Sequence, residues 1–343
     1  MNPPTPRLAR SLVVQTSFLG DVILTTPLLA ELADRGPVDV VVTALGATLL
    51  IGHPAVRHVH IYDKRGRDGG ASGFLRLARR LRAEGAADIA YLAQGSVRSG
   101  ALALAARYHT RIGFDTSAGR WLYTSRIPYR RDRHHAERLL LLAGPRTVPN
   151  EARARPRLFP QAEDRRAVDT LLAAAGVHSG EPLIALAPGS VWWTKRWPYF
   201  PALARLLPAD ARVVVIGSAA DTVLAREIVD QAGPRVIDAT GSLSLLASAE
   251  LIGRSRVLVT NDSAPLHMAS AMDTPTVAVF GPTVPRFGFG PLATRHAVAG
   301  LVDLACRPCH AHGPMRCPLT HFRCMRDLTA EHVHGLALSL SGT

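Results

Sequence analysis

The feature that most constrains the fold of this chain is a regular alternation of short β-branched runs with longer segments of helical period. In the first half, helix-like stretches rich in Ala, Leu and Arg occupy residues 74–84 and 98–108. The strands expected around them are residues 12–16, 38–43, 58–62, 88–93 and 111–114. Such alternation predicts a parallel sheet with helices on both faces. The expected fold class is therefore α/β.

A polar, proline-bearing stretch at residues 144–160 interrupts the alternation and predicts a domain boundary. Beyond it the apolar runs are nearly continuous, which is typical of strands buried on both faces. These expected strands are residues 183–187, 212–216, 235–238, 256–260 and 276–280. A length of 343 residues suits two domains.

We therefore expect two Rossmann-like domains, an N-terminal one at residues 1–155 and a C-terminal one at 156–343. In doubly wound sheets, ligands bind beyond the carboxyl ends of the strands. The chemistry should then lie in the loops that follow residues 16, 187, 216, 260 and 280.

The formal charge of +13 and the pI of about 10.6 indicate an anionic partner. The arginines are scattered, and no RNA-binding or zinc-finger signature appears, so an anionic lipid or small molecule is favoured over nucleic acid. The densest basic patch is residues 126–138, which is either a solvated surface or a contact for phosphates on an acceptor or membrane.

No uncharged apolar run of about 18 residues exists. The expected location is the cytoplasm, with membrane-surface contact left open.

The first motif, TSFLGDVILTTP, follows the first expected strand and places Asp21 at the start of a helix. One interpretation is a helix N-cap, which a lone aspartate at this position favours. The other is a general base that deprotonates an acceptor hydroxyl. Pro27 suits the first turns of a helix but would kink it if it lay deeper.

The second motif, APGSVWWTKRWP, follows the strand at 183–187. Ser190 and Thr194 could donate hydroxyl hydrogen bonds to phosphate oxygens, and Lys195 could supply a positive charge. A solvated surface lysine is the alternative for Lys195.

The third motif, TNDSAPLHMASAM, opens a helix after the strand at 256–260. Asp262 and Ser263 are good cap residues, and Pro265 suits a first helical turn. The helix start could receive a diphosphate, with His267 as a further donor, or the helix could be purely structural. Asp221, after the strand at 212–216, could accept hydrogen bonds from ribose hydroxyls or belong to a surface loop.

All four cysteines fall in one short segment, which suggests a structural metal knuckle or a set of reduced thiols. They are Cys306, Cys309, Cys317 and Cys324. A catalytic metal is not expected, and no cofactor-binding fingerprint such as GxGxxG or a Walker A loop is present. The absence of an Asp-x-Asp motif predicts that a helix dipole, lysine and hydroxyls would neutralise a diphosphate, without a metal.

Together the three motifs, in this order, resemble the bacterial lipopolysaccharide heptosyltransferases, glycosyltransferase family 9. The Cys-rich tail ending CPLTHFRCM resembles most the members that act second on the inner core. The resemblance implies a GT-B fold, an ADP-heptose donor, a lipid A-linked inner-core acceptor, and inversion at the anomeric carbon without a metal. Contact with the inner face of the cytoplasmic membrane would need no transmembrane helix and is left open.

The same resemblance assigns roles to individual residues. Asp21 matches the catalytic base, and Lys195 matches the phosphate-contacting lysine. The other residues expected to bind the ADP-sugar are Ser190, Thr194, Asp221, Asp262, Ser263, Ala264 and His267. Another acceptor or sugar within the family, a two-domain sugar-nucleotide epimerase, and a basic nucleotide- or lipid-binding protein remain the alternatives.

Overall fold

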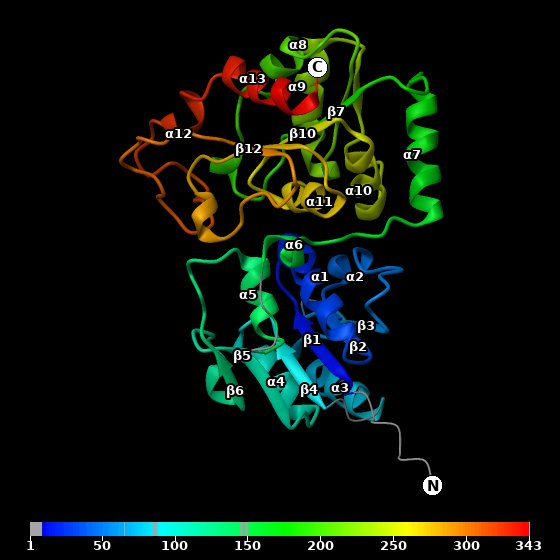
Figure 1. The fold of residues 1–343 in the computed structure, drawn as a ribbon, viewed down its shortest axis with the longest axis vertical. Helices are drawn as coiled ribbons and strands as arrows, with labels where there is room; N and C mark the ends of the chain where they lie inside the picture. Colours follow the sequence, from blue (N-terminus) through cyan, green and yellow to red (C-terminus); the bar gives the residue numbers. More distant parts are fainter. Residues whose placement is uncertain (1–8, 65, 85–87, 145–146, 148–149, 343) are drawn as a thin grey trace. The chain divides into compact units, whose positions relative to one another are not determined.

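The computed structural model describes residues 9–64, 66–84, 88–144, 147 and 150–342. The chain divides into two compact units, Met1–Phe159 and Pro160–Thr343. Each contains a six-stranded parallel sheet with helices packed against it (Figure 1). The α/β fold expected from the sequence is therefore confirmed. Within the described residues, no helix combines the length and hydrophobicity needed to cross a membrane.

The first unit has the strand order β3-β2-β1-β4-β5-β6. Its strands are β1 (Ser11–Gln15), β2 (Val38–Val42), β3 (His58–Ile61), β4 (Ile89–Leu92), β5 (Thr110–Phe114) and β6 (Ser125–Ile127). Its helices are α1 (Leu19–Ala33), α2 (Ala44–Thr48), α3 (Gly70–Ala83), α4 (Val97–Ala105), α5 (His135–Leu141) and α6 (Glu151–Ala154). The strand order reverses between β1 and β4, which pair directly in parallel.

The second unit repeats this order as β12-β11-β10-β7-β8-β9. Its strands are β7 (Leu183–Ala187), β8 (Arg212–Val215), β9 (Val236–Asp238), β10 (Val257–Asn261), β11 (Thr276–Val279) and β12 (His296–Ala299). Its helices are α7 (Ala162–Ala174), α8 (Phe200–Leu206), α9 (Thr222–Ala232), α10 (Leu245–Arg254), α11 (Ala264–Met272), α12 (Arg323–Arg326) and α13 (Ala330–Ser341). In Figure 1, α8, α9 and α13 lie on one face of this sheet, and α10 and α11 on the other.

The central strands β1, β2, β7 and β10 are buried along their whole length, as their near-continuous apolar sequences predict. The edge strands β6 and β12 are absent from the sequence-based expectations. Both are short and mostly exposed, so they lack the buried apolar run that marks a strand. The expected boundary stretch includes a short helix, α6, while residues 145–146 and 148–149 lie outside the described part.

Candidate active site

The centre of the candidate site in the second unit is a buried ion pair at the topological switch point. Lys195 Nζ lies 2.6 Å from Asp262 Oδ2. Lys195 ends a 3-10 turn, Trp193–Lys195, in the loop after β7, whereas Asp262 directly follows β10. Because β7 and β10 are adjacent parallel strands, their carboxyl ends bring the two loops together. Lys195 is only 9% exposed, so the interpretation as a solvated surface lysine is wrong.

Thr283 completes this constellation from a third loop. Its hydroxyl donates to Asp262 Oδ2 over 2.7 Å, and the residue follows β11, the next strand of the sheet. The carboxylate of Asp262 is thus occupied by an ammonium and a hydroxyl, and it does not cap α11 as the sequence suggested. Ser263 is the N-cap by position and Pro265 lies in the first turn, which agrees with the prediction.

The Ser263 hydroxyl donates to the preceding backbone carbonyl of Asn261 over 3.3 Å, instead of accepting a hydrogen bond from a backbone N–H of α11. Ala264 is the first residue of α11. His267 is buried, and its ring meets Phe289 edge-on with centroids 6.4 Å apart. The sequence motif therefore does form a buried strand-to-helix turn with its polar residues at the helix start.

Asn261 is a structural member of the site that sequence reasoning missed. Its side-chain amide donates to the carbonyl of Pro188 over 2.7 Å and accepts from the backbone N–H of Trp197 over 3.1 Å. These bonds fix both ends of the loop that carries Lys195. The sequence could have indicated this role, because Asn261 ends an otherwise apolar strand. A buried polar side chain requires hydrogen-bond partners.

The Cys-rich segment packs directly on the Lys195 loop. The Thr194 hydroxyl donates to the carbonyl of Pro314, and Trp192 stacks on His312 with ring centroids 6.2 Å apart. At Gly313, where φ is +84°, an added Cβ would lie 3.2 Å from Cγ of Lys195. The Arg307 guanidinium donates to the carbonyls that follow β11, at 2.8 Å from Phe280 O and 3.1 Å from Thr283 O. The Cys-rich segment thus packs against two loops of the site. From the sequence, only a metal knuckle or free thiols were expected, and this role was not predicted.

Ser190 and Asp221 make their contacts in neighbouring loops. Ser190 Oγ accepts from the N–H of Trp192 over 3.4 Å. Asp221 Oδ2 accepts from the N–H and the hydroxyl of Ser218, at 2.9 and 2.7 Å. Gly189 sits against this carboxylate, since a Cβ there would lie 2.5 Å from Asp221 Oδ1. Asp221 therefore lies beside the loop after β7, where a glycine leaves room for it.

In the first unit, Asp21 occupies the third position of α1, and Phe18 is the N-cap residue. Asp21 Oδ2 accepts from the Ser17 hydroxyl over 2.7 Å and from the Phe18 N–H over 3.3 Å. The alternative interpretation of Asp21 as the N-cap is thus corrected: Asp21 is the carboxylate of a capping box, at the third residue of the helix. Pro27 lies inside α1, which nevertheless continues to Ala33.

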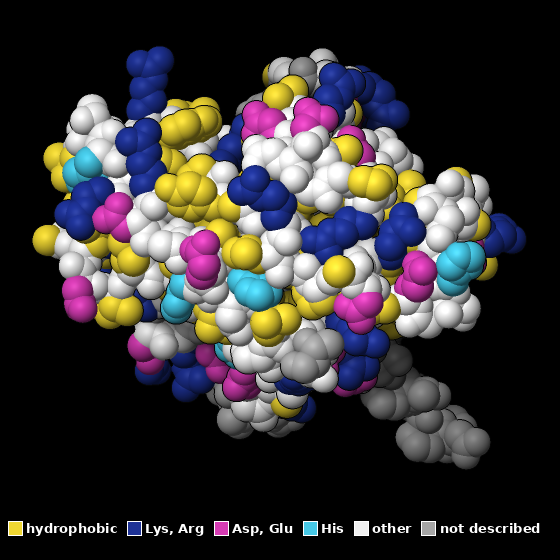
Figure 2. All heavy atoms as spheres, turned by 90° about the horizontal axis from the view of Figure 1, so that it is seen from above, with side chains coloured by type: hydrophobic (Ala, Val, Ile, Leu, Met, Phe, Trp, Pro, Cys, Tyr) yellow, Lys and Arg dark blue, Asp and Glu magenta, His cyan; other side chains and the backbone are white. Residues whose placement is uncertain are grey.

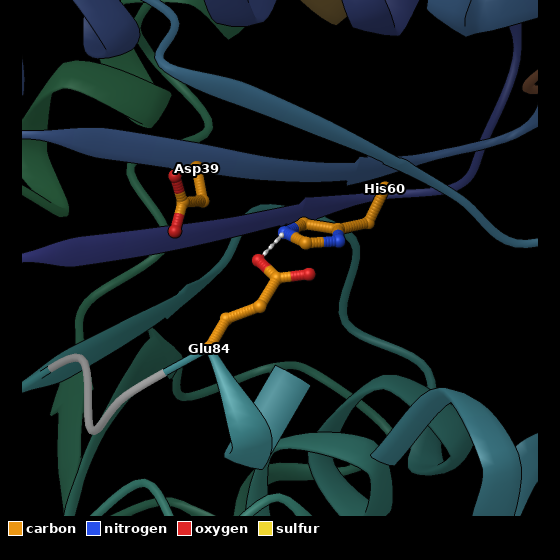
Figure 3. Close-up of side chains that lie close together, drawn as sticks. All are labelled: Asp39, His60 and Glu84. Carbon is orange, nitrogen blue, oxygen red and sulfur yellow. Dashed lines mark ion pairs between the residues drawn. The ribbon is translucent and has the colours of Figure 1, made fainter. Parts of the chain in front are cut away.

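A possible metal-binding group occurs at Asp39, His60 and Glu84, whose ligand atoms lie within 4.8 Å of one another (Figure 3). His60 Nε2 is 3.3 Å from Glu84 Oε2. Asp39, however, accepts from Arg10 Nε over 2.7 Å and from Arg57 Nε over 2.9 Å. Burial opposes ionisation of Asp39, but the hydrogen bonds and the positive charges of Arg57 and Arg10 together outweigh it and hold the pKa of Asp39 below its usual value. The cluster is an ion-pair network, not a cation site.

The four cysteines are all free thiols. Within the described residues, no three of the Cys and His side chains of this segment bring their ligand atoms within 4.8 Å of one another. Tetrahedral Zn–S bonds of about 2.3 Å require sulfur atoms closer than that. Cys306 Sγ lies 3.9 Å from His321 Nε2. Burial raises the pKa of the Cys324 thiol to about 11.

In the basic patch of residues 126–138, Arg126, Arg130 and Arg131 are exposed. Ala136 and Arg138 are buried, and Arg138 donates to Tyr129 Oη over 2.8 Å. Figure 2 shows one face of the molecule, on which Lys and Arg side chains are dispersed among hydrophobic and acidic ones. This dispersion matches the scattered arginines of the sequence.

Two Rossmann-like sheets in one chain, with a charged constellation at the switch point of the second, are the fold of GT-B glycosyltransferases. The sequence profile described as glycosyltransferase family 9 (heptosyltransferase) matches residues 74–317. The chain belongs to this family.

Two curated relatives illustrate the similarity. Lipopolysaccharide heptosyltransferase 1 of Pseudomonas aeruginosa is 31% identical over 321 residues, covering 88% of this chain and 86% of the relative. Lipooligosaccharide heptosyltransferase 2 of Campylobacter jejuni is 30% identical over 165 residues, covering 46% of this chain. That match spans about half of the Campylobacter protein, 51% of its length.

Solved structures show the same fold. A family 9 glycosyltransferase from Veillonella parvula superposes with a TM-score of 0.86 at 25% identity, covering 99% of both chains. The Escherichia coli ADP-heptose lipopolysaccharide heptosyltransferase II gives 0.77 at 24% identity, covering 97% of this chain and 98% of the other.

Proposed function

We propose that this protein transfers L-glycero-D-manno-heptose from ADP-heptose to the heptose of the lipopolysaccharide inner core. The observation that carries the proposal is the Lys195–Asp262–Thr283 constellation beside the start of α11. It lies at the switch point of a sheet whose topology binds nucleotides in many enzymes. Relatives named as lipopolysaccharide or lipooligosaccharide heptosyltransferases of both types support the transferred sugar and the acceptor class. The similar structure named as an ADP-heptose lipopolysaccharide heptosyltransferase supports the donor.

In the proposed reaction, the second unit holds the donor. An ammonium group has three N–H donors, so Lys195 can keep its bond to Asp262 and still donate to phosphate oxygens. The backbone N–H groups and the dipole of α11 add positive potential at Ser263 and Ala264. Ser190, Thr194, Asp221 and His267 complete the proposed ADP-sugar site. These groups would stabilise the charge on the departing ADP without a metal ion.

The first unit is proposed to bind the acceptor and to supply the base. The acceptor oxygen attacks the anomeric carbon, the bond to the ADP oxygen breaks with its electron pair, and Asp21 takes the hydroxyl proton. Displacement from the face opposite ADP inverts the anomeric configuration. The net charge of +13 suits a phosphorylated, lipid-linked acceptor at the inner face of the cytoplasmic membrane.

The test is incubation of the protein with ADP-heptose and a panel of truncated core acceptors, followed by mass spectrometry. We expect one heptose to be added to an acceptor that already carries one heptose, and none to the heptose-free core. Addition to the heptose-free core instead would indicate the first inner-core transfer. Release of free heptose without any acceptor would favour an epimerase-like or hydrolytic reaction.

A further inference from the structure

The two carboxylate oxygens of Asp21 have different surroundings. Oδ2 is engaged at the start of its own helix by the Ser17 hydroxyl and the Phe18 N–H. Oδ1 faces a second helix, because His135 Nε2 lies 3.7 Å from it. His135 is the first residue of α5, a helix that packs against α1. The side chains of His135 and Asp21 are only 12% and 17% exposed.

The His135 ring is neutral at physiological pH. Burial lowers its pKa to about 3, and the positive charge of Arg138 on the same helix acts in the same direction. The other carboxylate nearby on α5, Glu137, accepts from the His134 N–H over 3.0 Å and lies 3.7 Å from Arg133. A neutral imidazole carries one N–H, so it can donate to Asp21 only when the proton is on Nε2.

We propose that His135 is a positioning residue for Asp21, donating from Nε2–H to Oδ1 when an acceptor hydroxyl is bound. The proposal rests on the proposed function of Asp21 as the base. At 3.7 Å the contact is longer than a hydrogen bond, but such bonds are often long in ligand-free enzymes and tighten in the reactive complex. With Oδ2 held by the helix start and Oδ1 held by His135, the carboxylate plane is fixed from both sides. A neutral imidazole lowers the basicity of the carboxylate less than an imidazolium would, so it orients Asp21 and leaves it able to accept the proton.

The test compares three substitutions of His135 that differ in whether an N–H group remains and in which ring nitrogen that group replaces. His135→Gln keeps an N–H near the Nε2 position, His135→Asn keeps one near Nδ1, and His135→Ala keeps neither. We expect Asn and Ala to lower kcat for heptose transfer by about 10- to 100-fold, as loss of orientation does. His135→Gln should retain most of the activity, and ADP affinity measured by calorimetry should be unchanged in all three.

The matched control is His60→Gln, because His60 is also a buried histidine whose Nε2 faces a carboxylate in the same unit. It should leave kcat unchanged. Equal kcat for the Gln and Asn variants, or wild-type kcat in His135→Ala, would overturn the proposal. So would a loss of kcat that follows the melting temperature and is shared by His60→Gln, since that pattern indicates a structural role.

A second measurement does not depend on transfer activity. Nitrogen-15 NMR of the histidine rings should show His135 as the Nε2–H tautomer, and Asp21→Asn should shift its Nε2 resonance. An Nδ1–H tautomer would overturn the positioning role even in an active enzyme. If the wild-type protein fails to transfer heptose while the tautomer is as expected, the proposed substrates are wrong but the pairing with Asp21 stands.

Discussion

Lys195 Nζ and Asp262 Oδ2 lie 2.6 Å apart although 67 positions separate the two residues in the chain. The pair joins the loops after β7 and β10, and Thr283 adds a third loop through its hydroxyl. Both charged side chains are about one-tenth exposed, at 11% and 10%. The ion pair therefore holds the site together as well as placing an ammonium group in it.

Replacing Lys195 should reduce both stability and donor binding. Lys195→Ala leaves the buried Asp262 carboxylate without its cation, which costs about 3–5 kcal/mol of unfolding free energy in comparable pairs. The double variant Lys195→Ala/Asp262→Ala removes the uncompensated charge, so it should recover stability but not ADP affinity. Chemical denaturation and calorimetry measure the two effects separately. Recovery of ADP binding in the double variant would argue against contact between Lys195 and phosphate.

Asp21→Asn should strongly reduce transfer while preserving the local structure. Asn can still accept from Ser17 and Phe18, so the loss of stability should stay within about 1 kcal/mol, the scale of a helix-dipole charge. Turnover should fall by about 10²- to 10⁴-fold, because the amide cannot take the acceptor proton. Steady-state kinetics with ADP affinity as the reference measure this. Asp34→Asn, at the other end of α1, is the control, and unchanged turnover in Asp21→Asn would refute the role of a base.

Gly189→Ala tests the close approach of Asp221. The new Cβ would lie 2.5 Å from Asp221 Oδ1, and Ser218 holds that carboxylate in place. We expect a loss of about 1–3 kcal/mol, typical of overpacking. Combining it with Asp221→Ala should relieve most of this loss, and denaturant unfolding of the single and double variants measures the coupling. Additive losses would show that the two side chains do not compete for this space.

Stability should fall as the pH falls from about 6.5 to 4, in part because of His53. Burial lowers the pKa of His53 from 6.5 to about 4, so the unfolded chain binds a proton in this range before the folded chain does. Its contribution is fully present above pH 6.5 and is on the order of 3 kcal/mol. His53 Nδ1 accepts from the Ala55 N–H over 3.2 Å, a bond that His53→Asn can keep. Unfolding measured at pH 4.5, 5.5 and 7 should show a smaller slope in this variant, and an unchanged slope would exclude His53 as a source.

Thiol labelling should distinguish the cysteines. Cys324 is buried and its thiol pKa is raised to about 11, whereas Cys309 is exposed. In native protein at pH 8, mass spectrometry should find Cys324 labelled last. Protection of all four thiols, lost on addition of a chelator and accompanied by a bound metal ion, would instead demonstrate the metal knuckle that the sequence left open.

Much of the fold could be predicted because short sequence patterns, mainly apolar runs and helical periodicity, indicate most of its strands and helices. The apolar runs of β1, β2, β7 and β10 mark strands buried on both faces, and all four were expected close to their observed bounds. The edge strands β6 and β12 escaped prediction because pairing with one neighbour, not burial, makes them strands. The alternation of strands and helices also predicted that the loops of Lys195 and Asp262 lie together, since the carboxyl ends of parallel strands lie at the same edge of the sheet.

The sequence by itself determined the α/β class, the resemblance to one family and the placement of polar motifs after particular strands. Only the tertiary structure decided which partners those side chains take: Lys195 with Asp262, Asp221 beside Gly189, and Asp21 opposite His135. The physical reason is the distance along the chain over which the deciding interactions act. Strand and helix formation depends on neighbours a few positions away, whereas the charge state and orientation of a buried side chain depend on groups brought to it by folding.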